Sequence, residues 1–346
     1  MLVDKIVIRL DAGERFGLGH LSRCISLVHG FKNINPIFIV KTDNLSLVKT
    51  YLKKTINLPF NLIPLDLNVD LINEINLIES CCKEHTLLIL DHYCASEDYQ
   101  IEIKNRNISW LQLDSHAKVN FFANWVMHGS PGATKALYEP LRKCAKTRFL
   151  LGPKYCIIKD QLRLQKEKRR LRIDLKKVII CFGGGNDGGV TLKCLKSLDF
   201  KLFHDIEFSV VINPNNSDLE EITKFEKQGL IKLYDQYELT ELMINSDLAL
   251  IAPGMMSYES AFLGLPMILI TIADNQIINA ISWENRGCGI NVGGLNDIPI
   301  NINSHINHCK STLYEMSENC LTLVDGNGVE RIVNEIKNEK SINLRN

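Results

Sequence analysis

Short apolar segments of strand length alternate with helix-like segments along most of this chain, and this alternation restricts the fold more than any other feature. Strands are predicted at 6–9, 36–40, 61–64, 86–90 and 109–113 in the first half, and at 178–182, 208–212, 232–234, 247–251 and 267–272 in the second. Helices are predicted from Leu21 onward, at 45–54, 69–82, 190–198, 219–227 and 239–245, up to Gly264, and near 306–313 and 328–337. Strands joined through helices pair in parallel, with helices on both faces of the sheet. The sequence therefore predicts an α/β fold of two Rossmann-like domains facing a cleft.

The length of 346 residues favours two domains of ordinary size. We expect an N-terminal Rossmann-like domain over 1–152, a linker over 153–174, and a C-terminal Rossmann-like domain over 175–346. The basic run KEKRRLR, at 166–172, is interpreted as a solvated helix face or a linker.

Composition excludes several classes of function. The formal net charge is zero and the pI is about 7.1, which argues against nucleic-acid or membrane binding driven by bulk charge. No apolar run has the roughly 18 residues of a spanning helix, so we expect a cytoplasmic protein without stable membrane insertion. We also expect the protein to be a monomer. The 11 cysteines include no C-x-x-C pair and are interpreted as reduced structural residues.

A glycine-rich connection follows the first predicted strand. Gly17 and Gly19 allow close backbone approach, and the helix that begins beyond them presents free N–H groups to an anion or a polar ligand. Four functional groups surround this turn: Arg9, Asp11, His20 and Arg23. His20 is either a neutral base beside the helix N-terminus or a packing or capping residue.

Two further strands end in aspartate. Asp91 is followed by His92 and Tyr93, and Asp114 follows the strand at 109–113. Because the carboxyl ends of parallel strands meet at one edge, these residues should face the same cleft as His20. The aspartates either cap turns or orient catalytic groups and sugar hydroxyls, and Tyr93 is either a core residue or an exposed functional one.

The second half contains two similar turns. Gly183 and Gly184 follow the strand at 178–182, and Gly254 opens the helix that carries Glu259. A glycine loop at a helix start can hold a diphosphate with backbone amides. Glu259 either accepts both ribose hydroxyls of a nucleotide or complements the helix dipole. Asn275 and Gln276 offer amide groups at the same edge. The cluster His305, His308 and Cys309 lacks further ligands, so no metal site and no cofactor are expected.

Seven stretches of the chain resemble the UDP-2,4-diacetamido-2,4,6-trideoxy-β-L-altropyranose hydrolases, the UDP-sugar hydrolases of pseudaminic acid biosynthesis. They are RLDAGERFGLGHLSRC at 9–24, LDHY at 90–93, LLGPKY at 150–155, FGGGND at 182–187, PGMMSYESAFLGLP at 253–266, ADNQ at 273–276 and DGNGVERI at 325–332. They follow the family order across nearly the whole chain.

This resemblance implies the two-domain GT-B architecture and a hydrolase that needs no metal. UDP would lie on the C-terminal domain, with Glu259 at the ribose, the Gly254 loop at the diphosphate and the backbone at 235–237 facing uracil. The sugar would enter the N-terminal domain, where His20 activates water at the anomeric carbon. The expected catalytic residues are His20, Asp11 and Tyr93. The expected substrate-binding residues are Arg9, Gly17, Gly19, Arg23, Gly183, Gly184, Gln236, Tyr237, Gly254, Met255, Met256, Ser257, Glu259, Asn275 and Gln276.

One position departs from the family pattern. Met255 and Met256 stand where small hydroxyl residues are common in the family, which leaves the exact sugar or nucleotide open. A GT-B glycosyltransferase is the rival enzyme, although the N-terminal half contains no obvious membrane-docking helix. A nucleotide-sugar-binding protein without catalysis is the other rival, although His20, Asp11 and Tyr93 are all present. The free sugar would supply a nonulosonic acid for a surface polysaccharide or a glycosylated flagellin.

Overall fold

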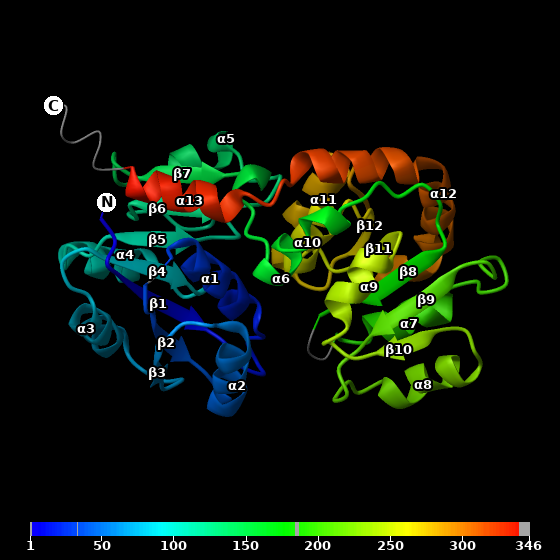
Figure 1. Cartoon of the computed structure of the whole chain (residues 1–346), viewed down its shortest axis with the longest axis horizontal. Coiled ribbons are helices and arrows are strands. Elements are labelled where there is room, and N and C mark those ends of the chain that lie inside the picture. The colour runs from blue at the N-terminus through cyan, green and yellow to red at the C-terminus, as the bar shows by residue number, and fades with distance from the viewer. Residues whose placement is uncertain (1, 33, 184–186, 339–346) are drawn as a thin grey trace. The chain divides into compact units, whose positions relative to one another are not determined.

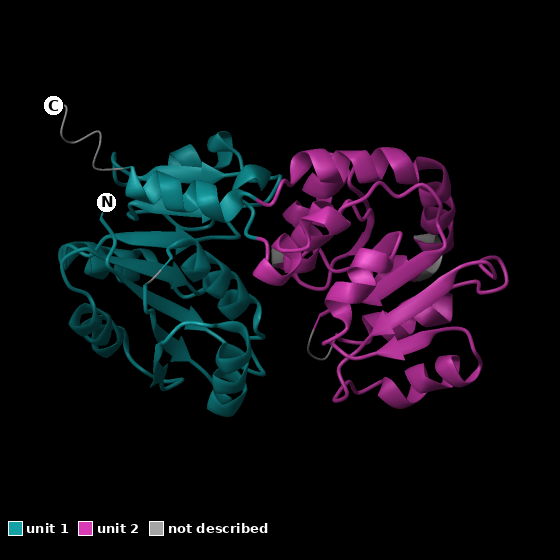
Figure 2. Cartoon of the chain, in the orientation of Figure 1, with its two compact units in different colours: residues 1–157, 327–346 teal, residues 158–326 magenta. Residues whose placement is uncertain are grey.

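The computed structural model describes residues 2–32, 34–183 and 187–338. The chain divides into two compact units, which Figure 2 shows in different colours. Unit 1 comprises residues 1–157 and 327–346, and unit 2 comprises residues 158–326. Each unit contains one parallel sheet with helices, as predicted (Figure 1).

Unit 1 is built on a seven-stranded sheet in the order β3-β2-β1-β4-β5-β6-β7. Its strands are β1 Lys5–Asp11, β2 Ile37–Lys41, β3 Asn61–Leu65, β4 Thr86–Asp91, β5 Trp110–Leu113, β6 Trp125–His128 and β7 Arg148–Leu151. All neighbouring pairs are parallel. In β1 the side chains alternate between the two faces, because Ile6 and Ile8 belong to one buried cluster and Val7 belongs to another.

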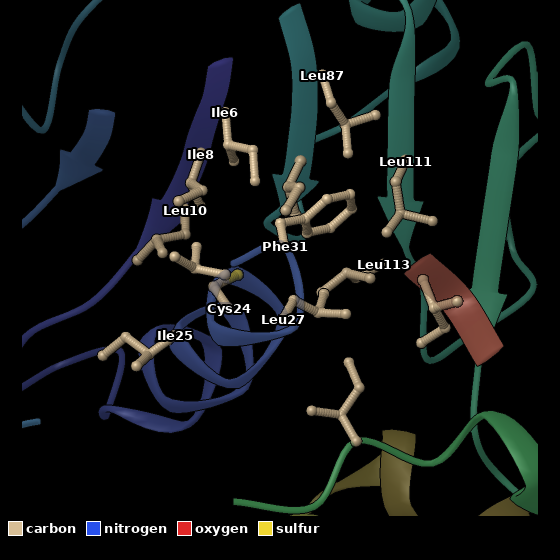
Figure 3. Close-up of a cluster of buried hydrophobic side chains, with 14 of the residues drawn as sticks. Ile6, Ile8, Leu10, Cys24, Ile25, Leu27, Phe31, Leu87, Leu111 and Leu113 are labelled. Carbon is tan, nitrogen blue, oxygen red and sulfur yellow. The ribbon is translucent and has the colours of Figure 1, made fainter. Parts of the chain in front are cut away.

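Helices cover both faces of this sheet. The helices α1 Gly19–Gly30, α2 Leu45–Thr55 and α13 Gly328–Lys337 contribute side chains to the first cluster. The helices α3 Leu71–Cys81, α4 Glu97–Asn105 and the short α5 Lys135–Tyr138 contribute to the second. Figure 3 shows Leu27 and Phe31, in and just after α1, beside strand residues such as Leu111. The packing of α1 against the sheet fixes the direction from which its first turn approaches the carboxyl ends of the strands.

Unit 2 is built on a six-stranded parallel sheet in the order β10-β9-β8-β11-β12-β13. Its strands are β8 Lys177–Cys181, β9 Glu207–Val211, β10 Lys232–Tyr234, β11 Leu248–Ile251, β12 Met267–Ile270 and β13 Gly289–Gly293. Its helices are α6 Asp160–Arg163, α7 Val190–Ser197, α8 Leu219–Lys227, α9 Leu239–Asn245, α10 Met255–Leu263, α11 Ile277–Glu284 and α12 Ile298–Leu323. Side chains from α7, α8 and α12 pack against one face of the sheet. Single 3₁₀ turns lie at Glu139–Leu141, Pro153–Tyr155, Lys166–Lys168, Asp274–Gln276 and Leu295–Asp297.

The predicted domain limits are wrong at the C-terminal end. The helix α13 was expected in the second domain, yet it belongs to unit 1, where Val329, Ile332 and Val333 join the core beneath α1. Gly30 makes this packing possible, because a Cβ at that position would come within 2.5 Å of Val329. The chain thus leaves unit 1 after Ile157 and returns at Asn327.

The predicted linker is also wrong, because most of it is anchored in unit 2. Arg172 is completely buried and donates hydrogen bonds to the carbonyl oxygens of Ser246 and Ile244. Burial lowers the pKa of Arg172 to about 10, so the guanidinium remains charged at neutral pH. Arg169 likewise donates to the carbonyl oxygen of Phe262. Arg169 and Arg172 therefore hold the start of unit 2 against its core, whereas Lys166, Glu167 and Lys168 of the same run form an exposed 3₁₀ turn.

Candidate active site

The first candidate site lies where the strand order of unit 1 changes direction. β1 and β4 are neighbours, but the chain continues from β1 to β2 on one side and from β4 to β5 on the other. Connections that leave two neighbouring strands in opposite directions open a crevice at the carboxyl ends, where open α/β sheets bind ligands. The segments after β1 and β4 carry His20 and Tyr93, two of the predicted catalytic residues.

His20 and Asp91 form a buried hydrogen-bonded pair at this crevice. His20 is in the first turn of α1, and its Nδ1 lies 2.7 Å from Oδ1 of Asp91, the last residue of β4. A carboxylate at this distance accepts the Nδ1 proton, which leaves the lone pair on Nε2. The helix begins after Leu18 without a side-chain cap, so His20 is not a capping residue. In this arrangement Nε2 of His20 carries a lone pair that can accept a proton, as in other His–Asp pairs.

Arg23 completes this group from the next turn of α1. Its Nε donates to Oδ2 of Asp91 at 2.6 Å, and its Nη2 donates to Oδ1 of the same carboxylate. Nη2 also lies 3.1 Å from Nδ1 of His20. Burial alone would raise the pKa of Asp91, but the charges and hydrogen bonds of Arg23 and His20 outweigh it and hold that pKa well below its usual range. Asp91 therefore stays ionised and keeps the imidazole in one orientation.

A cavity of about 270 Å³ lies beside this pair. Tyr93 is 63% exposed and meets the ring of His20 edge-to-face at 4.9 Å and that of His116 at 5.0 Å. The structure therefore places Tyr93 at the open side of the cavity and not in the core. The cavity is lined by His20, Arg23, Asp91, His92, Tyr93, Ala95, Gln112, Leu113, Asp114, Ser115, His116, Lys118 and Val119.

Asp114 lines the same cavity and also stabilises the turn that follows β5. Its Oδ2 accepts the backbone N–H groups of His116 and Ala117 at 3.1 and 2.8 Å. The hydroxyl of Tyr138 donates to the same oxygen at 2.5 Å and lies 2.6 Å from Nδ1 of His128. Burial lowers the pKa of His128 to about 4, so this imidazole is neutral. Asp114 is thus a turn-forming residue held rigidly at the cavity wall.

Arg9 and Asp11 lie in a separate buried ion-pair cluster. Arg9 donates to Asp11 and to Glu74, each at 2.6 Å, and the hydroxyl of Tyr99 donates to Glu74 at 2.6 Å. The carboxylate that pairs with His20 is therefore Asp91 and not Asp11. Neither Arg9 nor Asp11 belongs to the described lining of the cavity. Their placement makes them supports of the strand end, and a direct role for Asp11 stays a prediction.

The glycine connection before α1 has the open backbone that the sequence predicts. Gly17 has φ +73°, and both Gly17 and Gly19 have open space where a Cβ would stand. Asp43 anchors the loop by accepting the backbone N–H groups of Glu14 and Arg15 at 2.9 and 2.8 Å. No acidic residue occupies the first turn of α1, so its N–H groups are not neutralised locally.

Unit 2 has the corresponding crevice between β8 and β11. Gly183 follows β8 with φ +112° and open space at its Cβ position, whereas Gly184 lies outside the described residues. Gly254 is the N-cap residue of α10 and has no side chain that could cap the helix start. The half-buried Met255 and Met256 form the first turn, which contains no acidic side chain. The free N–H groups of this turn suit an anionic ligand.

Ser257 differs from the prediction, because its side chain is engaged inside the turn. The Ser257 residue is fully buried; its hydroxyl donates to the Gly254 carbonyl oxygen at 2.6 Å and accepts from Nε1 of Trp283 at 2.9 Å. Asn279 also donates to the Pro253 carbonyl oxygen. Both Asn279 and Trp283 belong to α11, which the sequence patterns did not reveal. Ser257 therefore shapes the Gly254 loop and does not offer its hydroxyl to a ligand.

Glu259 is 1% exposed, and its Oε1 lies 2.9 Å from Nζ of Lys159. Glu259 lies beyond the first turn of α10, which contains no acidic residue, and it is buried against a cation, so it does not serve only to complement the helix dipole. Glu259 thus supplies a negative charge at the carboxyl edge of the sheet of unit 2. A hydroxyl ligand would have to take over part of the contact with Lys159.

The remaining predicted residues of unit 2 lie on loops. Gln236 is exposed and Tyr237 is 82% exposed, while the backbone N–H of Tyr237 donates to Asp235 at 2.7 Å. Gln276 accepts the backbone N–H of Ile272 at 3.0 Å, so its carbonyl oxygen stabilises its own loop. The side chain of Asn275 lies outside what the structure describes. The assignment of these residues to UDP stays a prediction.

Among the described residues, no three His, Cys, Asp or Glu side chains are grouped so that they could hold a metal, and this includes the surroundings of His305 and His308. No helix in the described ranges is both long enough and apolar enough to cross a bilayer.

Comparisons with known sequences give distant relatives, and no family model matches the chain. The uncharacterized protein MJ1062 of Methanocaldococcus jannaschii is 27% identical over 77% of this chain, but the match spans only 55% of that protein, about half its length. The spore coat polysaccharide biosynthesis protein SpsG of Bacillus subtilis is 23% identical over 93% of this chain and 94% of its own. The UDP-2,4-diacetamido-2,4,6-trideoxy-β-L-altropyranose hydrolase of Campylobacter jejuni is 24% identical over 82% of this chain and 97% of its own.

Solved structures of the same fold cover nearly the whole chain. MurG of Acinetobacter baumannii has a TM-score of 0.64 at 13% identity, covering 96% of this chain and 99% of its own. UDP-GlcNAc 2-epimerase of Neisseria meningitidis, solved with UDP-GlcNAc, has a TM-score of 0.62 at 11% identity and covers 97% of this chain and 100% of its own. These likenesses confirm the predicted GT-B fold of two Rossmann-like domains.

Proposed function

We propose that this chain hydrolyses a UDP-linked 2,4-diacetamido-2,4,6-trideoxy hexose to UDP and the free sugar, in the biosynthesis of a pseudaminic-type nonulosonic acid. The observation that carries the proposal is the buried His20–Asp91 pair beside a cavity at the carboxyl edge of the unit 1 sheet. A distant relative named as such a hydrolase, and a solved neighbour with bound UDP-GlcNAc, support the substrate class.

In the proposed reaction, Nε2 of His20 takes a proton from a water molecule. The water oxygen bonds to the anomeric carbon, the bond from that carbon to the diphosphate oxygen breaks, and UDP leaves with the electron pair. Asp91 holds the tautomer and stabilises the imidazolium that forms, while Arg23 holds Asp91. The first-turn N–H groups of α10 would bind the diphosphate, and Glu259 would bind the ribose.

The direct test of hydrolysis is UDP release without an acceptor. The purified protein is incubated with the diacetamido UDP-sugar, and UDP is measured alone and after addition of acceptor candidates. Release of UDP in the absence of acceptor supports hydrolysis. Release that requires an acceptor would make the chain a GT-B glycosyltransferase, and tight binding without any release would make it a nucleotide-sugar-binding protein.

Glu259→Ala should weaken UDP binding by about 1.5–3 kcal/mol, roughly 10- to 150-fold in Kd, because a charged hydrogen-bond acceptor for the ribose is lost. Calorimetry with UDP measures this, and Glu220→Ala, an exposed glutamate on α8, is the matched control. A folded Glu259→Ala variant with the wild-type affinity would remove Glu259 from the nucleotide site.

Activity should survive treatment with EDTA. The proposed reaction assigns stabilisation of the leaving diphosphate to helix N–H groups, which supply partial positive charge without a divalent ion. The rate of UDP release is compared before and after chelation and dialysis. Loss of activity that only a divalent cation restores would contradict this mechanism and reopen Asp91 and Asp114 as ligands.

A further inference from the structure

Two buried polar side chains of the unit 1 cavity have no use in the proposed reaction. His92 is 5% exposed and Gln112 is 3% exposed, and both line the cavity. In the part of the chain that the structure describes, both ring nitrogens of His92 and the Oε1 of Gln112 lack a hydrogen-bond partner. A buried polar group without a partner costs about 1–3 kcal/mol. Two such groups in one cavity therefore point to a ligand that supplies the missing bonds.

These two groups come from neighbouring strands. Gln112 lies in β5, where it is paired in register with Leu90 of β4, and His92 follows two residues after Leu90. The lining of the same cavity also includes the apolar side chains of Ala95 and Leu113. Val119 adds a further apolar surface to the same cavity. The cavity thus combines polar atoms that lack partners with apolar walls.

The protonation state of His92 determines what it can bind. Burial, together with the nearby charge of Arg9, holds the pKa of His92 well below its usual range. Lys41 and His20 act in the same direction, whereas Asp91 opposes them. The imidazole is therefore neutral at physiological pH and has one N–H donor and one acceptor nitrogen. Gln112 Oε1 is an acceptor only.

We propose that His92 and Gln112 bind an N-acyl group of the sugar. The amide N–H of the ligand donates to Oε1 of Gln112, the amide carbonyl accepts the N–H of His92, and the acyl methyl lies against the apolar cavity wall. A carboxylate lacks the donor that Gln112 requires, and a hydroxyl lacks the apolar part. This inference rests on the proposed function for the sugar, and it makes His92 and Gln112 specificity-determining residues.

The test compares acylated and deacylated forms of one nucleotide sugar. The probes are UDP-2,4-diacetamido-2,4,6-trideoxy-altropyranose and its two derivatives that each carry a free amine in place of one acetamido group. His92→Phe keeps a ring of similar size, and Gln112→Leu keeps the side-chain volume. Values of Kd are measured in the His20→Asn background, in which turnover is slow, and kcat/KM is measured with His20 intact.

The wild-type cavity should favour the acylated sugar over one of the two amines by roughly 10- to 100-fold. Both variants should lose most of this preference through weaker binding of the acylated sugar, with little change for that amine. His116→Phe, a change of the same kind beside Tyr93 in the same cavity, should keep the wild-type ratio. Thermal unfolding and UDP affinity confirm that each variant is folded.

The outcomes separate this inference from the proposed function. Unchanged ratios in both folded variants would overturn the acyl-binding role even if the protein releases UDP. No release of UDP, together with a Kd preference that the variants abolish, would overturn hydrolysis and support acyl binding. Equal wild-type affinity for all three probes would also overturn the acyl-binding role.

Discussion

Replacing His20 with asparagine should lower the turnover of the UDP-sugar by about 10²–10⁴-fold, the usual contribution of a general base. Asparagine keeps a polar side chain near Asp91 but has no nitrogen that accepts a proton from water. UDP affinity should change little, because the proposed nucleotide site lies in unit 2. The two measurements are steady-state UDP release and calorimetry with UDP.

The wild-type rate should also fall at acid pH, because a protonated imidazole no longer accepts a proton from water. The His20→Asn variant should lack this acid limb in its residual activity. His29→Asn, on the last turn of α1, is a control outside the cavity. A His20→Asn variant with near wild-type turnover would make His20 structural, and the base would then be sought at Asp11 or Tyr93.

Asp91→Asn should lower turnover by as much as about 10⁴-fold while leaving the shape of the side chain unchanged. An amide at this position can donate to Nδ1 of His20, which moves the imidazole proton to Nε2 and removes the base. The variant is assayed for UDP release beside Asp98→Asn, an exposed aspartate on α4. Wild-type turnover in a folded Asp91→Asn protein would contradict the orienting role of Asp91.

The same substitution should destabilise the protein by about 3 kcal/mol, because Arg23 loses the carboxylate that neutralises it. The pKa of Asp91 is lower in the folded protein than in the unfolded chain. Its contribution is therefore complete above the ordinary aspartate pKa of about 3.9 and is lost as the pH falls toward the lowered value. Urea unfolding should show the full difference between the variants at pH 7 and a smaller one in acid.

Most of the fold could be predicted because each strand–helix unit has a local pattern. Several of the elements that escaped prediction are short or atypical: β6 and β7 have four residues each, and β13 contains three glycines or asparagines in five positions. The nine-residue helix α4 also escaped prediction. The helix α11 has apolar residues on its exposed side, including Ile277 and Ile281, which obscures its periodicity.

The composition of the site was harder to predict than its location. The carboxyl ends of parallel strands meet at one edge of the sheet, and the residues that follow them are expected at that edge. This predicts the location of His20, Asp91, Tyr93 and Asp114. The contact between His20 and Asp91 joins residues 71 positions apart, and no local pattern distinguishes Asp91 from Asp11 as the partner. Asp11 is unavailable to His20 because it pairs with Arg9. That pair depends on the burial of Arg9 against side chains from α3 and α4.

The return of α13 to unit 1 has a consequence for biogenesis. Unit 2 is one continuous stretch, so it can complete its sheet as soon as the ribosome has released it. Unit 1 is synthesised first but lacks Val329, Ile332 and Val333 until translation has passed through all of unit 2. During that interval the apolar surface beneath α13 is open to chaperones and to aggregation. The domain translated first is therefore the last to mature.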